Sequence, residues 1–269
     1  TGLSIEGTDD ATRTFGSLLC GPMSASNGLI TVSVDNSGAV SLAQKEGPSF
    51  EGLFLYEDSG DCGDGWTRGI PVNDTVFRSY GSSVITGIEE NGPLRTTFRI
   101  ERQFSLPRAL DPKTKTRSMD RVTVTVTDLV SLEKHCGAVL VKTIIENTAE
   151  DHRLRVIFPT RRDAEHSFAD TPFAIVEREI QIPEHTAIWQ ERINEEKPFT
   201  SFCGCADSQG GLAVVSPAGL HEYAVLPTAA RELAVTLLRA FGKTVGKPRE
   251  KDGQLKGSLC LEYAIVPFS

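Results

Sequence analysis

Residues 121–127 read Arg-Val-Thr-Val-Thr-Val-Thr, with every even position apolar and every odd position polar. Successive side chains of a β-strand point to opposite faces, so this alternation predicts a strand with one buried and one solvated face. Similar runs rich in Val, Ile, Thr and Phe recur about every ten residues between Gly, Pro, Asn or Asp, which is typical of an antiparallel sandwich or barrel. The clearest runs are residues 29–34, 94–104, 121–130, 139–146, 154–159, 173–182, 212–216 and 259–266.

Three further segments extend this β pattern. Asp35-Asn36-Ser37-Gly38 is predicted to form a hairpin turn between strands 30–34 and 39–43, because Asn and Gly can take positive φ. Residues 228–242 contain good helix formers at helical spacing, but they also alternate as a strand with two covered faces would. We predict a strand there. Residues 243–256 are rich in Lys, Gly and charge, which predicts an exposed loop before the last strand.

The composition bounds the class of protein. The chain has 269 residues, 36 acidic and 28 basic, with a net charge of −8, and its 39% hydrophobic residues suffice for a packed core. The acidic balance, without any basic stripe, argues against nucleic-acid binding. No apolar run approaches about 18 residues, so neither a membrane span nor a signal peptide is predicted. The chain opens on Thr1 without a targeting pattern, and we expect a piece of a longer protein.

Cysteine and histidine spacing argues against a metal site within the chain. The six cysteines include no C-x-x-C pair and are too dilute for a disulfide framework, so we expect reduced thiols and a cytoplasmic location. Cys203 and Cys205 would share one face of a strand, but no second pair completes four ligands, which favours buried thiols. No H-x-H, H-E-x-x-H or H-x-x-x-H pair occurs among the five histidines, which are His135, His152, His166, His185 and His221.

The densest acidic stretch is residues 57–66, Glu-Asp-Ser-Gly-Asp-Cys-Gly-Asp-Gly-Trp. Its glycines allow sharp turns that gather oxygens, which suggests either a calcium site or the paired carboxylates of a glycosidase. The residue order of an EF-hand is not met, and spacing within a loop cannot establish a catalytic pair. The plain alternative is a solvated turn whose Asp side chains cap neighbouring N–H groups.

Residues 168–178, Phe-Ala-Asp-Thr-Pro-Phe-Ala-Ile-Val-Glu-Arg, join aromatic, acidic and basic side chains around a turn. Carboxylates and guanidinium groups bind sugar hydroxyls through charge-assisted hydrogen bonds, and aromatic faces cover the apolar surface of a sugar ring. Asp170 and Arg178 are therefore candidates for carbohydrate contacts. Alternatively, they form an ordinary surface ion pair.

Several stretches, in order, resemble the C-terminal β domain of glycoside hydrolase family 38 α-mannosidases, especially that of the bacterial members. The resemblance begins with Ser26-Asn27-Gly28-Leu29-Ile30-Thr31-Val32-Ser33-Val34-Asp35 and then Gly38. It continues through residues 54–64, 141–149, 151–160, 168–178 and 211–242. The similarity spans about residues 26–266, and the ordered set of stretches is fairly specific.

This resemblance implies a fold and an enzyme. The fold is a large antiparallel β-sandwich, a supersandwich of the galactose-mutarotase-like type, with residues 1–25 as a leading segment and residues 26–269 as the sandwich. The enzyme is a retaining α-mannosidase whose zinc ligands, including an early His-x-Asp, and nucleophilic Asp belong to an N-terminal α/β domain followed by a helical region. Those segments are absent from this chain. We therefore assign it no catalytic residue, metal ligand or cofactor of its own, and expect the chain alone to be inactive.

The resemblance also implies residues that border the substrate. In the family, a Tyr a few residues beyond the Gly-Asp-x-Gly-Asp run faces the substrate, and Trp66 stands at the matching position here. Trp keeps a flat face and an N–H donor but lacks the phenolic hydroxyl, so the sugar preference at that position can differ. The further candidates for hydrogen bonds to the substrate or at the domain seam are Asp58, Asp61, Asp64, Asp170 and Arg178. Asp61 and Asp64 alternatively only hold the shape of the loop.

The sequence as a whole predicts a β domain that lends a wall to the mannoside-binding site of a bacterial α-mannosidase. Its expected partners are a mannoside or oligosaccharide and the N-terminal catalytic and helical domains of the same polypeptide, which would dock on an apolar face. We expect no nucleic-acid or membrane partner, and the longer enzyme could form a homo-oligomer. Two other functions remain open: a free-standing lectin-like module, and a mutarotase-like epimerase with a His and a carboxylate as acid and base.

Overall fold

The computed structural model describes residues 16–184, 188, 193–217, 220, 222–244, 247–248 and 252–269. These residues form four antiparallel sheets, of five, nine, six and two strands, and contain no α-helix. The predicted all-β antiparallel fold is therefore confirmed. His185, His221 and residues 1–15 of the expected leading segment lie outside the described residues.

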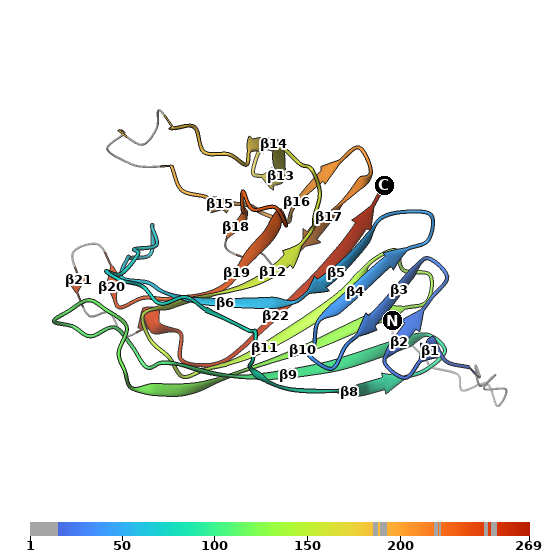
Figure 1. Ribbon diagram of the computed structural model, residues 1–269, viewed down its shortest axis with the longest axis horizontal. Helices are drawn as coiled ribbons and strands as arrows, with labels where there is room; N and C mark the ends of the chain where they lie inside the picture. The colour runs from blue at the N-terminus through green and yellow to red at the C-terminus, as the bar shows by residue number, and fades with distance from the viewer. Residues whose placement is uncertain are drawn as a thin grey trace, which may run out of the picture.

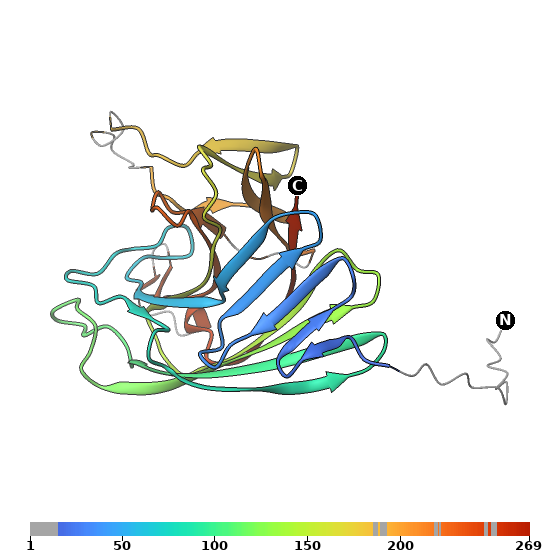
Figure 2. The ribbon, with the colours of Figure 1, turned by 45° about the vertical axis from the view of Figure 1, so that its right-hand side comes forward.

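The five-stranded sheet is a meander in which each strand pairs with the next in sequence (Figure 2). Its β3–β4 connection is the predicted hairpin: the Asp35 carboxylate accepts hydrogen bonds from the N–H groups of Ser37 (2.8 Å) and Ala39 (3.0 Å). Of the two residues expected at positive φ, only Gly38 adopts it (76°). Among the described residues the first strand begins at Leu19, within residues 1–25 that we expect to lead into the sandwich. The strands are β1 (Leu19–Gly21), β2 (Ser24–Ser26), β3 (Ile30–Val34), β4 (Val40–Gln44) and β5 (Ser49–Leu53).

The nine-stranded sheet contains six of the eight runs predicted above. Its order is β14 (Ala174–Glu179), β13 (His166–Thr171), β16 (Phe202–Asp207), β17 (Gly210–Val215), β22 (Gly257–Phe268), β11 (Val139–Asn147), β10 (Arg121–Glu133), β9 (Arg95–Pro107) and β8 (Ser83–Asn91). The run at 173–182 was predicted too long, because β14 ends at Glu179. In β10 the even positions face the core as predicted, with Val124 and Val126 fully buried.

The six-stranded sheet lies above the long strands β8–β11 and β22 (Figure 1). Its order is β15 (Lys197–Pro198), β18 (Glu222–Val225), β19 (Glu232–Ala240), β12 (His152–Pro159), β6 (Leu55–Gly60) and β7 (Phe77–Arg78). The strand predicted within residues 228–242 is confirmed as β19. Every residue of β19 and of β12 is buried, so these two central strands are covered on both faces.

One hydrophobic core joins the three larger sheets, and a buried polar group lies within it. Phe54 and Phe158 meet edge to face with ring centroids 5.4 Å apart. Between the six- and nine-stranded sheets, the Asp128 carboxylate accepts hydrogen bonds from the hydroxyls of Tyr56 (2.6 Å) and Thr143 (2.7 Å). We call the following buried residues the inter-sheet hub: Tyr56, Arg102, Asp128, Thr143 and Tyr263.

The segment before the last strand differs from the exposed loop predicted for residues 243–256. It contains the two-stranded sheet of β20 (Lys243–Thr244) and β21 (Lys247–Pro248) and the 3-10 turn η2 (Asp252–Gln254). Gln254 is buried, because its side chain exchanges hydrogen bonds with Asp151 at 2.7 and 2.8 Å. This long-range contact carries no signal in the local sequence. Within the described residues, no helix has the length and apolar character to cross a membrane.

Candidate functional site

The loop between β6 and β7, residues 61–76, is closed on itself by Asp61. This buried carboxylate accepts hydrogen bonds from the N–H groups of Gly63 (2.9 Å) and Gly69 (3.0 Å), and from Arg239 Nε (2.9 Å) of β19. A Cβ at Gly63 would lie 2.0 Å from the carbonyl oxygen of Thr67, so a glycine is required there. These contacts fit the interpretation that Asp61 holds the shape of the loop.

The tip of this loop presents Trp66 to solvent. The Asp64 carboxylate accepts hydrogen bonds from the N–H groups of Trp66 (2.9 Å) and Thr67 (3.1 Å), and these bonds lower the pKa of Asp64. The Trp66 side chain is 81% exposed, and Ile70 and Val72 of the same loop are also exposed. The loop therefore offers a flat aromatic ring and neighbouring apolar side chains as a contact surface.

Asp58 points into the molecule. Its carboxylate lies 2.6 Å from His152 Nδ1 of β12 and forms an ion pair at 2.5 Å with Arg117, and all three side chains are buried. The ring of His152 also hydrogen-bonds Asn147 through Nε2 (3.0 Å). Asp58 thus fastens residue 117 of the β9–β10 connection to the six-stranded sheet. A His and a carboxylate do meet here, as an epimerase would need, but the described residues leave them no path to solvent.

The opposite face of the six-stranded sheet carries charged residues. Because Tyr56 and Asp58 point inward, Glu57 between them points outward, where it meets Arg155, its register partner on β12. Arg155 Nε lies 3.1 Å from Glu57 Oε1, and Arg78 Nη2 lies 2.8 Å from Glu57 Oε2. We call this group the outer ionic cluster: Glu57, Arg78, Arg153, Arg155, Glu196 and Glu232.

The outer ionic cluster has buried donors without acceptors. Arg153 pairs with Glu196, yet its Nε, like Nη1 of Arg155, has no hydrogen-bond acceptor among the described residues. Burial, together with the nearby guanidinium groups of Arg155 and Arg68, lowers the pKa of Arg153 to about 10. Burial opposes ionisation of Glu57, but Arg155 and other neighbouring cations hold its pKa below the ordinary value. The outer ionic cluster is therefore charged, and two of its buried donors have no acceptor among the described residues.

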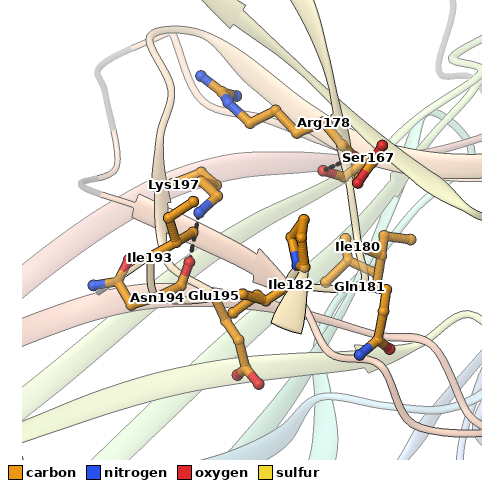
Figure 3. A pocket seen from close by; sticks show the side chains of 12 residues that line it. Ser167, Arg178, Ile180, Gln181, Ile182, Ile193, Asn194, Glu195 and Lys197 are labelled. Atoms are coloured by element: carbon orange, nitrogen blue, oxygen red, sulfur yellow. Dashed lines mark hydrogen bonds between the residues drawn. The ribbon is translucent and has the colours of Figure 1, made fainter. Parts of the chain in front are cut away.

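A pocket of about 300 Å³ lies beside this face, between β13–β14 and residues 180–183 and 193–197. Arg178 lines it and donates a hydrogen bond from Nη1 to the Tyr223 hydroxyl (3.3 Å). Burial lowers the pKa of Lys197, and the positive charge of Arg178 lowers it further. In Figure 3 the guanidinium of Arg178 lies above Lys197, and the Glu195 carboxylate points away from both. The pocket combines two cations and two carboxylates, those of Glu179 and Glu195, with isoleucine side chains.

Asp170 lies on the same hairpin as Arg178, but the two side chains are not paired. Its carboxylate accepts hydrogen bonds from the hydroxyls of Ser201 (2.5 Å) and Thr200 (2.6 Å), which lower the pKa of Asp170. The register places Asp170 opposite Ile175 and Arg178 opposite Ser167. The ion pair considered between Asp170 and Arg178 is not among those formed by the described residues.

The structure therefore divides the predicted site residues into three groups. Asp61, Asp64 and Trp66 share one loop, Asp170 and Arg178 share one hairpin, and Asp58 is internal. None of these placements tests contact with a sugar, so the six assignments stay predictions. Sequence reasoning missed the outer ionic cluster. Its available signal was the sequence His-Arg-Leu-Arg-Val at 152–156, where arginines alternate with apolar residues inside a strand.

Cysteine and metal chemistry adds little to this face. The thiols of Cys203 and Cys205 are buried in the core, and burial raises the pKa of both. All six cysteines are free. Within the described part of the chain, no group of three or more His, Cys, Asp or Glu side chains could hold a metal ion. The resemblance places the zinc ligands in an N-terminal domain outside this chain.

The fold and this face define a large antiparallel β-sandwich domain with an ionic sheet face and an exposed aromatic loop beside it. Comparison with family models gives the family. Residues 23–244 match the model of the glycosyl hydrolases family 38 C-terminal domain, and the chain belongs to that family.

Individual relatives agree with this assignment. The chain is 28% identical over 232 residues to a protein of Halalkalibacterium halodurans named "Putative mannosylglycerate hydrolase", covering 81% of this chain and 25% of that protein. An α-mannosidase structure from Enterococcus faecalis V583 superimposes with a TM-score of 0.86 at 26% identity, covering 94% of this chain and 30% of that one. A second family 38 structure from Enterococcus faecalis gives 0.83 at 26% identity, covering 94% of this chain and 31% of that one. The chain thus spans roughly a quarter to a third of its relatives' length.

Proposed function

We propose that this chain is the non-catalytic C-terminal β domain of a retaining, zinc-dependent glycoside hydrolase that removes terminal α-mannosides. In that polypeptide it forms the carbohydrate-facing wall of the active site and packs against the N-terminal catalytic and helical domains. The observation that carries the proposal is the outer ionic cluster, whose buried Arg153 and Arg155 donors lack acceptors among the described residues. Buried donors of this kind favour a partner surface or ligand that supplies oxygens.

The candidate residues have distinct roles in this proposal. Trp66 supplies a flat ring for the apolar face of a sugar or for a neighbouring domain, and Asp61 and Asp64 fix the loop that carries it. Arg178 donates hydrogen bonds to hydroxyl or carboxylate oxygens from the rim of the neighbouring pocket. Asp58 and Asp170 act as positioning residues, because their carboxylates already bond other parts of the chain.

Cleavage of the glycosidic bond is assigned to the regions of the longer polypeptide that correspond to the parts of the relatives outside this chain. Zinc, when bound there, would orient and polarise the substrate oxygens. The residues described here hold no step of the double displacement; they bind and orient the sugar and exclude water from one side. We place the enzyme in the cytoplasm, supported by six free cysteines, and allow for homo-oligomerisation of the longer protein.

The proposal that this domain forms one wall of the active site can be tested by measuring kcat/KM of variants of the longer polypeptide. With an aryl α-mannoside, Trp66→Ala is expected to lower kcat/KM about threefold to tenfold, and Trp66→Tyr, which keeps a flat ring, should retain most of it. Ile85→Ala provides the control, because Ile85 is an exposed apolar residue on β8 in another sheet. An unchanged kcat/KM in Trp66→Ala, or α-mannoside hydrolysis by the 269-residue chain alone, contradicts the proposal.

A free-standing carbohydrate-binding module is the second candidate, and the pocket beside Arg178 favours it. A volume of about 300 Å³ with mixed polar and apolar lining lies in the range of small-molecule sites. Titration calorimetry of the 269-residue chain with mannose and mannobiose separates the two functions. If the chain is only one wall of an active site, it should not bind either sugar with micromolar affinity in the absence of the catalytic domain. If it is a free-standing module, the wild-type chain should bind the sugar and the Arg178→Gln variant should not.

A further inference from the structure

A second pocket, of about 280 Å³, lies where β12 ends and β19 begins. Three of its seven lining residues are arginines, in a chain whose net charge is −8. One aspartate accompanies them, so the lining carries a net charge of +2. The pocket is lined by Arg161, Arg162, Asp163, Pro227, Thr228, Ala229 and Arg231.

The two turns that form this pocket are bonded to each other. The N–H of Arg161 donates to the carbonyl of Ala230 (2.8 Å), and the Thr160 hydroxyl donates to the carbonyl of Arg231 (2.7 Å). Arg161 and Arg231 take positive φ values of 51° and 42°, a conformation that disfavours residues with a Cβ. The backbone therefore fixes the two arginines opposite one another in a conformation that glycine would adopt at lower cost.

Neutral groups orient the guanidiniums of Arg161 and Arg162. Arg161 Nη1 donates to the carbonyl of Glu51 (2.8 Å), and Arg162 stacks on the Phe50 ring with its guanidinium carbon 5.0 Å from the centroid. Arg162 also donates to the carbonyls of Thr160 and Ser49. Carbonyl oxygens and a ring hold a guanidinium in place without cancelling its charge.

Carboxylates compensate little of this charge. Arg162 Nη1 lies 3.8 Å from Asp207 Oδ1, beyond hydrogen-bond distance. Within the described residues, neither Arg161 nor Arg231 has a carboxylate at ion-pair distance, and the guanidinium of Arg231 has no hydrogen-bond acceptor. Asp163 is exposed, and its backbone N–H donates to Asp207. Arg161 and Arg231 therefore keep free donors at the pocket.

We propose that this pocket binds a small oxyanion, the phosphate or carboxylate group of a ligand. A guanidinium presents parallel N–H donors that match two oxygens of such a group, and facing arginines can hold it from two sides. No aromatic residue lines the pocket to cover a neutral sugar ring. The three arginines and Asp163 give the lining a net charge of +2, so an oxyanion with a charge of −2 would neutralise it.

This oxyanion site lies away from the Trp66 loop but borders the outer ionic cluster, because the hydroxyl of Thr228 in its lining donates a hydrogen bond to Glu232 (3.3 Å). β12 begins at His152 opposite Gly60, beside the loop of Trp66, and ends at Pro159 opposite Glu232, beside the oxyanion pocket. Eight residues of extended strand span roughly 25 Å between them. The kinetic test at Trp66 and the anion titration of this pocket can therefore fail independently, because the two sites lie at opposite ends of β12.

Titration of the 269-residue chain with inorganic phosphate and with malonate, at constant ionic strength in chloride, tests the site. We expect calorimetric binding by at least one of them, accompanied by a higher melting temperature. Binding by phosphate alone identifies a phosphate-bearing ligand, and binding by malonate alone a carboxylate. No binding beyond the chloride background with either probe would overturn the proposal.

Substitutions locate the binding. Arg231→Asn removes the guanidinium while keeping a residue that tolerates positive φ, and we expect it to weaken binding about tenfold or more. Arg108→Asn is the matched control, because it loses the same charge from an exposed side chain directly after β9. Equal binding by Arg231→Asn and wild type would overturn the site. If Arg231→Asn does not fold, Arg161→Asn provides the same comparison.

Discussion

The inter-sheet hub and the outer ionic cluster are both buried and ionic, but they differ in how completely their polar atoms are bonded. In the hub, Asp128 accepts hydrogen bonds from Tyr56, Thr143 and Arg102, and Arg102 also donates to the carbonyl of Gly38. No side-chain polar atom of the hub lacks a partner, whereas the outer cluster leaves donors of two arginines unbonded among the described residues.

Because of this difference, the two groups are expected to contribute differently to the stability of the domain. A fully bonded polar group stabilises one arrangement of two sheets, since any other arrangement would leave buried charges unpaired. An incompletely bonded group weakens the isolated domain until water, an ion or another surface supplies its missing partners. The two groups lie on opposite faces of the six-stranded sheet, and β6 contributes to both, with Tyr56 in the hub and Glu57 in the outer ionic cluster.

The largest expected effect is in the hub. Asp128→Ala leaves Arg102 buried without its carboxylate, and we expect a loss of about 3–5 kcal/mol in the free energy of unfolding, measured by urea denaturation. Asp120→Ala is the control, because that side chain is 82% exposed and its contact with Arg108 spans 3.8 Å. It should change stability by less than about 0.5 kcal/mol. A similarly small change in Asp128→Ala would remove the distinction between the two groups.

The outer cluster should respond less to the loss of a charge. Arg153→Met removes a guanidinium whose Nε is unbonded. Glu196 still has a cationic partner, because Arg155 Nη1 lies 3.6 Å from Glu196 Oε1. We expect the free energy of unfolding to stay within about 1 kcal/mol of wild type, in the same urea experiment. A loss as large as that of Asp128→Ala would mean that the outer cluster is itself a structural element.

The two groups should also differ in the sign of their pH dependence. Arg155 and neighbouring cations outweigh burial and lower the pKa of Glu57 below 4.5, so its contribution is present above that pH and is lost as the pH falls through the folded-state pKa. Burial raises the pKa of Asp128, so the folded state takes up a proton there at higher pH than the unfolded chain, and acid favours folding at this group.

Glu57→Gln tests the sign at the outer cluster. The variant should lose less stability than wild type between pH 5 and pH 3, by about 1.4 kcal/mol for each unit by which the pKa of Glu57 is lowered. Urea denaturation across this range measures the difference. Parallel pH profiles of variant and wild type would contradict an ionised, stabilised Glu57.

The smallest effect on stability is expected at the loop. Trp66→Ala should change the free energy of unfolding by less than about 0.5 kcal/mol, because the ring is exposed and the loop is held by Asp61 and Asp64. Thermal unfolding followed by circular dichroism measures this. A loss above about 1 kcal/mol would show that the ring packs on the domain itself.

Local pattern predicted the strands, and long-range contacts account for what it missed. The alternation of residues 121–127 predicted β10, and its continuation placed a polar residue, Asp128, at a core position. That break in the pattern is the sequence signal of the hub, but its partner Tyr56 lies 72 residues away and follows no local rule. Likewise, the spacing of Asp61 suggested a turn, whereas its bond to Arg239 spans 178 residues.

The closed loop that carries Trp66 has a consequence for association. Asp61 and Gly63 complete the turn from within this chain, so the backbone that carries Trp66 is fixed without help from any other molecule. A molecule that binds at this loop does not have to order its backbone. The conformational entropy that a flexible loop would lose on binding has already been lost on folding. A backbone fixed in advance favours rapid binding of a partner that matches its shape over adaptation to many different partners.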